Sequence, residues 1–256
     1  MGLVNEKRLA IATWIAIIGT LAVNTLSNIF PIGGNTVADL ANGRLGGVLI
    51  TPESYAFTIW GVIYVGLIVY GFYQIQPRQR RRASIRQVNR NLIVACGAQI
   101  LWIFLFTLEQ FWLSVAAMLV ILVALTDAYL VLADAGPSTS QRQLYRAYIP
   151  FSIYLGWISV ATVVNIASAF YASGFTRLGW EAAAWTATMT AVANLIAAVG
   201  MVKQRNFAFA LVFVWADIAI AVRHLQTWVI WVPAVAAAAL LVALMLYYRR
   251  YPKKSW

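Results

Sequence analysis

Long runs of apolar residues, separated by short polar segments, dominate this chain. Eight of them are long enough, or nearly so, to cross the roughly 30 Å hydrocarbon core of a bilayer, which takes about 20 residues of helix. Because the runs are too long and too uniformly apolar for barrel strands, each predicts a transmembrane helix. We expect these helices at roughly residues 9–30, 55–75, 91–108, 111–133, 148–171, 182–202, 206–223 and 228–248.

The composition agrees with this pattern. Of the 256 residues, 62% are hydrophobic and 11% are charged, whereas a soluble domain is usually about half apolar and about a quarter charged. A soluble enzyme, a disordered chain and a disulfide-rich secreted domain are therefore excluded. The sequence predicts an all-α integral membrane protein of about eight transmembrane helices.

The basic residues predict the orientation of these helices. When eight spans are drawn, only Arg44, Arg177 and Arg223 fall on one side, and the remaining 16 of the 19 Lys and Arg residues fall on the other. Cytoplasmic loops carry an excess of Lys and Arg, so both termini are expected in the cytoplasm. The same asymmetry accounts for the net charge of +11 without any nucleic-acid partner. Anionic membrane lipids are the expected contacts of the basic segment 78–90.

The longest expected loop, residues 31–54, lies on the opposite, outer side. It contains five of the chain's glycines at positions 33, 34, 43, 46 and 47. Loops of this length without structure of their own are often binding loops or lids. The segment is therefore a candidate binding loop or lid.

The sequence contains few residues suited to catalysis or metal binding. The chain has one cysteine, Cys96, and one histidine, His224, which excludes an internal disulfide and a cluster of thiolate or imidazole metal ligands. No Gly-rich phosphate loop, nucleophile elbow or zinc-protease motif is present. We expect neither enzymatic activity nor a metal site.

Ten of the eleven tryptophans divide into two groups by depth. Trp112, Trp180, Trp185, Trp228 and Trp231 fall at or near the outer helix ends, where an aromatic belt is usual, and Trp256 is in the tail. Four others lie inside the expected spans: Trp60, Trp102, Trp157 and Trp215. Trp60 and Trp102 lie about 8–10 Å below the outer surface at 1.5 Å per residue. Packing is the commoner role of deep aromatics, and a pocket lining is the alternative.

Polar residues within the spans are costly in lipid and therefore informative. Helix–helix hydrogen bonding is the usual role of such buried amides. Asp217 is the only carboxylate near the membrane centre; we interpret it as structural, with proton coupling and pairing to Arg223 as alternatives. The in-span amides are Asn24, Asn28, Gln99, Asn165 and Asn194.

Three segments resemble the TspO/MBR family, the tryptophan-rich sensory and translocator proteins. TPESYAFTIWGVIY, from Thr51 to Tyr64, is similar to the family's loop and second helix with its Trp-x-x-x-Tyr pair. QILWIFLF, from Gln99 to Phe106, is similar to the third helix, with Gln where the family usually has Asn. YLGWISVATVVN, from Tyr154 to Asn165, is similar to the fifth helix.

The resemblance implies a fold, a site and a ligand class. It covers residues 1–171 as a TspO-like five-helix domain, and 172–256 would be an additional three-helix segment. It implies a membrane-embedded sensory or regulatory protein that binds a tetrapyrrole or a similar hydrophobic ligand such as a sterol. No cofactor is required; a porphyrin or haem-type molecule would be a ligand, with Cys96 the one candidate for an axial bond. The implied ligand-binding residues are Trp60, Tyr64, Gln99, Trp102, Phe106, Trp157 and Asn165.

Other functions stay open at this point. A secondary transporter of a small amphipathic solute is the main alternative, although the last four spans do not repeat the first four. An intramembrane enzyme acting on a pigment or lipid lacks acid–base pairs. A structural subunit of a membrane complex, or a homodimer, is also compatible with the sequence.

The topology is directly testable. When eight spans are drawn, 16 of 19 basic residues lie on one side. We therefore expect a reporter fused after Trp256 to show a cytoplasmic location. A reporter inserted within residues 35–50 should be active only outside the cytoplasm. Periplasmic activity of the C-terminal fusion would contradict the eight-span topology.

Overall fold

The computed structural model describes residues 2–134, 143–174 and 182–251, and helices make up most of these segments. Within them, eight helices have 16 residues or more: α1 (Gly2–Ile29), α3 (Ile59–Gln74), α5 (Ala83–Thr107), α6 (Phe111–Ala133), α8 (Ile149–Ala172), α9 (Ala182–Gln204), α10 (Phe207–Arg223) and α11 (Trp228–Arg250). The shorter elements are η1 (Ile32–Gly34), α2 (Val37–Asn42), η2 (Ser54–Thr58), α4 (Pro77–Arg80) and the π-helical turn η3 (Leu144–Tyr148).

The predicted class is confirmed, since seven helices of the described ranges are long and apolar enough to cross a membrane. The remaining expected span, 206–223, corresponds to α10, which has 17 residues and a length of about 26 Å at about 1.5 Å per residue. It is not among those seven, so the count of eight stays a prediction. The third span begins at Ala83, earlier than expected, because the helix continues through the basic segment. Arg142, Arg177, Trp180, Lys253, Lys254 and Trp256 lie outside the described residues.

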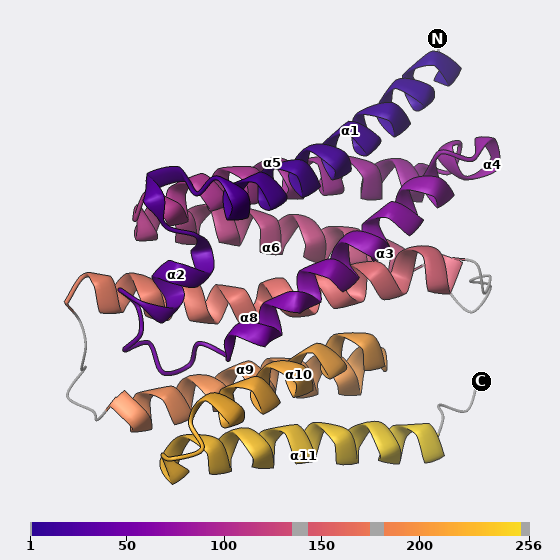
Figure 1. The fold of residues 1–256 in the computed structure, drawn as a ribbon. Coiled ribbons are helices and arrows are strands. Elements are labelled where there is room, and N and C mark those ends of the chain that lie inside the picture. The colour runs from indigo at the N-terminus through magenta and orange to yellow at the C-terminus, as the bar shows by residue number, and fades with distance from the viewer. Residues whose placement is uncertain (1, 135–142, 175–181, 252–256) are drawn as a thin grey trace.

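Helix α8 lies between two groups of helices (Figure 1). On one side it packs against α3 and α6, with α5 and α1 beyond; on the other it packs against α10 and α9, which pack in turn against α11. The start of α1, helix α4 and the end of α11 all lie at the same end of the bundle (Figure 1). We call the opposite end the lid end.

A chain of hydrogen bonds joins three polar side chains away from the lid end. Tyr70 donates to Asn89 Oδ1 (2.6 Å), and Asn89 donates to Gln74 Oε1 (2.9 Å). Gln74 then donates to the Ala10 carbonyl (3.0 Å). Because unpaired polar groups are expensive in hydrocarbon, this chain of hydrogen bonds ties α1, α3 and α5 together.

Residues 31–54, which we call the lid, connect α1 to α3 across the lid end. The segment has structure of its own, contrary to the expectation of an irregular loop. Thr36 and Asp39 form a capping box at the start of α2: the Asp39 N–H donates to Thr36 Oγ1 (3.0 Å), and the Thr36 N–H donates to Asp39 Oδ2 (2.9 Å). The hydrogen bonds from the Thr36 backbone and hydroxyl lower the pKa of the Asp39 carboxyl below its usual value.

Hydrogen bonds from Arg223 at the end of α10 and from His224, the next residue, attach the lid to the C-terminal helices. Arg223 donates to Asn42 Oδ1 (2.7 Å) and to the Pro52 carbonyl (3.3 Å). His224 Nε2 lies 2.8 Å from the Leu49 carbonyl oxygen and must donate to it, since a carbonyl only accepts. Burial lowers the pKa of His224, so the ring is neutral at pH 7. The Glu53 N–H and Trp215 Nε1 add donations to the carbonyls of Ala219 (3.2 Å) and Ala56 (3.1 Å).

The lid also contacts the turn between α5 and α6. Arg44 forms an ion pair with Glu109 in that turn. Gly33 packs against the end of α5 with φ 80°, and a Cβ there would lie 3.1 Å from the Thr107 carbonyl oxygen. A glycine suits this position because other residues rarely adopt that φ, and the space is too small for a side chain. The lid is thus held on two sides.

Removing the Arg223 guanidinium should loosen the lid without unfolding the bundle. We expect Arg223→Met to lose both hydrogen bonds and to raise hydrogen exchange at residues 42–53 by about five- to thirtyfold, as follows from a local loss of about 1–2 kcal/mol. Arg249→Met is the matched control, because Arg249 lies in the last turn of α11, at the opposite end of the bundle from the lid. It should leave hydrogen exchange in the lid unchanged. Equal exchange in Arg223→Met and the parent protein would show that α10 does not hold the lid.

Candidate ligand-binding pocket

A cavity of about 190 Å³ lies under the lid, inside the bundle. All of its lining residues come from the first five long helices, η2 and the lid, and none from α9, α10 or α11. They are Asn24, Ser27, Asn28, Val37, Ala38, Ala41, Thr51, Pro52, Phe57, Trp60, Trp102, Phe106, Met118, Trp157, Val160, Ala161, Val164, Asn165 and Ser168.

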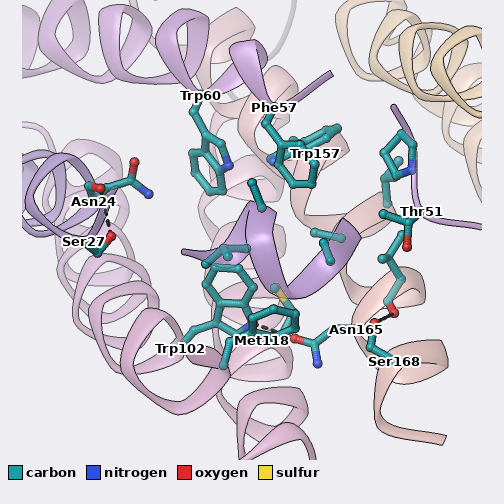
Figure 2. A pocket seen from close by; sticks show the side chains of 18 of the residues that line it. Asn24, Ser27, Thr51, Phe57, Trp60, Trp102, Met118, Trp157, Asn165 and Ser168 are labelled. Carbon is teal, nitrogen blue, oxygen red and sulfur yellow. Dashed lines mark hydrogen bonds between the residues drawn. The ribbon is translucent and has the colours of Figure 1, made fainter. Parts of the chain in front are cut away.

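Aromatic rings from four elements form much of the cavity wall. Trp60 and Trp157 lie with Phe57 on one side of the cavity, and Trp102 lies across from them (Figure 2). Phe57 meets Trp157 edge to face, with centroids 5.9 Å apart, and Trp102 packs on Phe106 at 5.2 Å. The surfaces offered to a ligand are therefore broad, flat and apolar.

Asn165 fixes the orientation of the Trp102 ring. Its Oδ1 accepts from Trp102 Nε1 (2.5 Å), and its Nδ2 donates to Ser114 Oγ (2.9 Å). Ser114 Oγ in turn donates to the Phe111 carbonyl (2.7 Å). Asn165 lines the cavity, but these partners occupy its polar atoms, so its role is to position Trp102.

Asn24 of α1 is the freer polar group of the cavity. Its backbone carbonyl accepts from Ser27 Oγ (2.9 Å) and Asn28 Nδ2 (2.7 Å). Its side-chain amide points toward the cavity opposite the aromatic cluster (Figure 2) and has no hydrogen-bond partner among the described residues. One amide beside flat apolar walls can orient a polar substituent on a mostly apolar ligand.

Five of the seven residues implied by the family resemblance line the cavity: Trp60, Trp102, Phe106, Trp157 and Asn165. Tyr64 and Gln99 do not. They lie one helical turn below Trp60 and Trp102, and the Trp60 ring stacks on Tyr64 with centroids 5.7 Å apart. The Tyr64 hydroxyl and both polar atoms of the Gln99 amide are buried without a hydrogen-bond partner. They form a second polar layer beneath the cavity.

Sequence reasoning missed the lining residues contributed by the lid. Thr51 and Pro52 of the lid, and Phe57 of η2 just after it, lie inside the family-like segment but are not among the residues that the resemblance implies. Ala38 and Ala41 lie on the unexpected helix α2. The sequence did carry a signal for α2, because Thr36-x-x-Asp39 is a capping-box pattern. Asn24 was singled out as polar but was assigned to helix contacts.

The cavity offers little to a metal ion. Its lining contains no His, Cys or Tyr, and Met118 supplies its only sulfur. Cys96 lies elsewhere, buried in α5, where its carbonyl accepts from Thr20 Oγ1 (3.4 Å). Across the described part of the chain, no three His, Cys, Asp or Glu side chains gather closely enough to hold a metal. The donor set fits a metal-free ring better than an iron porphyrin with a strong axial ligand.

These features define a membrane-embedded helical protein with an aromatic-lined, lidded cavity. The family model described as TSPO-like protein matches residues 10–247. The chain therefore belongs to the TSPO-like family, which confirms the resemblance seen in its motifs. The match extends beyond those motifs, through α9 and α10 and into α11. Comparisons with curated proteins and with solved structures gave no significant match.

The Asn165–Trp102 contact generates a stability prediction. Asn165→Leu keeps the size of the side chain but leaves Trp102 Nε1 and Ser114 without their partner, which should destabilise the protein by about 1–3 kcal/mol. The measurement is unfolding in detergent, followed by circular dichroism. Thr126→Val on the exposed face of α6 is the control, since its hydroxyl bonds only within its own helix. Equal stability of both variants would contradict the positioning role of Asn165.

Proposed function

We propose that this protein binds a flat hydrophobic ring ligand, of the tetrapyrrole class or a similar molecule such as a sterol, in a sensory or regulatory role. The observation that carries the proposal is the convergence of Phe57, Trp60, Trp102 and Trp157 on one cavity beneath the lid. Flat aromatic walls suit a flat ring by offset or edge-to-face packing, and the Asn24 amide can orient a polar substituent.

The size of the cavity sets a condition on binding. A volume of about 190 Å³ is below the roughly 300–1,000 Å³ typical of ligand pockets. A whole macrocycle therefore enters only if the lid moves outward, and a swing of the Trp60 ring would enlarge the cavity further. The second movement would open the layer beneath, where the Tyr64 hydroxyl and the Gln99 amide lack partners. A ligand reaching that layer would satisfy polar atoms that are otherwise costly.

The proposed ligand is a metal-free porphyrin rather than haem, because Met118 is the only cavity residue with a metal-binding sulfur. Binding rather than catalysis is proposed, since the cavity lining contains no acid or base. In the proposed topology the chain crosses a bacterial plasma membrane eight times, with both termini in the cytoplasm. The lid then faces the outer side, and ligand reaches the cavity from there.

A proton-coupled transporter is the second candidate, and the buried carboxyl of Asp217 is the observation that favours it. Two features weigh toward binding. The cavity is lined by the lid and by residues near the lid end, and Tyr64 and Gln99, one helical turn deeper, are not in its lining, which does not favour a path across the bundle. The lid is held by hydrogen bonds from α10, as expected of a site that retains its ligand.

Substituting the cavity tryptophans tests the binding proposal. Stacked aromatic pairs contribute about 0.5–1.5 kcal/mol beyond area burial, so Trp60→Leu or Trp102→Leu should weaken protoporphyrin binding about two- to tenfold. The measurement is quenching of tryptophan fluorescence during titration with protoporphyrin in nanodiscs.

Trp228→Leu is the matched control, because Trp228 is 70% exposed at the start of α11. It should leave the affinity unchanged. Equal losses at Trp60, Trp102 and Trp228 would indicate partitioning into the lipid or detergent phase. No quenching in any variant would overturn the tetrapyrrole proposal.

A further inference from the structure

A second, much smaller void lies on the other side of α8. Its volume is about 20 Å³, enough for about one water molecule. Asp217 of α10 and Thr190 of α9 are the polar residues in its lining, and the others are apolar. Asp217 is 3% exposed, so its carboxyl is enclosed by protein.

The hydrogen bonds around Asp217 leave two acceptors without a donor. Asn194 Nδ2 donates to Asp217 Oδ1 (3.0 Å) and to the Thr190 carbonyl (3.0 Å), which uses both of its hydrogens. Asp217 Oδ2 and Asn194 Oδ1 are both buried without a partner. Two buried acceptors without a donor, one on each of two side chains that are themselves hydrogen-bonded, call for a positively charged or hydrogen-donating species.

Among the residues that the structure describes, no cationic side chain supplies that donor. The void receives Val160, Val163 and Val164 from α8 and Ile50 from the lid. The residues that α11 buries, Ile230 to Met245, include no titratable side chain. Arg223, six residues beyond Asp217 on α10, bonds to Asn42 and Pro52 instead, which removes the pairing considered from the sequence. His224 and Glu53 lie beyond it at the lid end, and the His224 ring bonds to Leu49.

We propose that Asp217 binds a proton and that this proton site is coupled to the ligand pocket through α8. A proton on Oδ2 removes the charge, which an apolar environment penalises. It also turns Oδ2 into a donor for which the unpartnered Asn194 Oδ1 is an acceptor. A sodium ion is the less suitable occupant, because most of the lining is aliphatic and offers no further oxygen ligands.

The coupling rests on two residues that belong to both sites. Val160 and Val164 line the ligand cavity and also line the void beside Asp217. Valine has one strongly preferred χ1 rotamer in a helix, so a rotamer change does not absorb the pressure of a ligand on these side chains. The ligand instead shifts the side chains, and α8 with them, toward the void. A smaller void admits less water and favours the neutral acid. Ligand binding should then take up a proton, and by reciprocity a proton should strengthen ligand binding.

The proton itself can be detected without any ligand. In infrared spectra of the protein in nanodiscs at neutral pH, we expect a carbonyl band of a protonated carboxylic acid that disappears in Asp217→Asn. Asp127→Asn is the matched control, because Asp127 is an exposed carboxylate that accepts from Gln87 and Asn91. Asn194→Leu should keep the band and move it to higher frequency, since the donor to Oδ1 is removed.

Absence of the band in the parent protein, or its persistence in Asp217→Asn, would overturn the proton site. So would a band that sodium chloride abolishes at constant pH, because a cation would then have displaced the proton.

The coupling rests on the proposed ligand binding and is tested separately. With protoporphyrin dimethyl ester, which has no carboxylate, the parent protein should lose affinity as the pH rises, by up to about tenfold per pH unit for one linked proton. Asp217→Asn mimics the neutral acid and should hold the low-pH affinity throughout. Identical pH profiles in the two proteins would overturn the coupling. No binding in either, with the infrared band present, would overturn the proposed function while leaving the proton site intact.

Discussion

The attachment of the lid to α10 is the interaction on which the ligand pocket depends. A 24-residue connection at the membrane surface carries many backbone polar groups, and these must find partners if the connection is to stay ordered. Arg223 and His224 provide partners for the Pro52 and Leu49 carbonyls, and the Ala219 carbonyl accepts from the Glu53 N–H. The pocket itself is made only of the first five long helices and the lid. The C-terminal helices therefore act on the pocket indirectly, by holding its cover.

Local signals in the sequence predicted the membrane helices and the aromatic core of the site. Trp60 and Trp102 could be placed at similar depth from the helix rise, and the family pattern added Trp157 to them. The contact between Asn42 and Arg223 could not be predicted, since the two residues are 181 positions apart and neither has a local signal. Gln99 and Tyr64 were expected in the pocket, but the Trp60 ring covers Tyr64 and the cavity ends above both residues.

The polar residues inside the bundle show why position alone did not reveal their roles. Asn165 and Asn194 both looked like helix-bridging amides in the sequence. Asn165 does bridge helices, yet its effect is to set the Trp102 ring at the pocket wall. Asn194 bridges α9 to α10 but leaves its own oxygen and one Asp217 oxygen unsatisfied. Whether all the hydrogen-bonding groups of an amide are satisfied depends on neighbours from other helices, and a single sequence does not specify those neighbours.

The central claim is that ligand enters under the lid and that the lid must move for it to do so. The direct measurement is the rate of porphyrin uptake by the double variant Asn42→Cys/Arg223→Cys, before and after a short bis-maleimide cross-links the lid to α10. The native Cys96 is buried and should not react with the cross-linker. The account predicts fast uptake by the unlinked protein and strongly slowed uptake by the linked one, because a cavity of about 190 Å³ does not admit a macrocycle. Equal uptake rates in the two forms would contradict it.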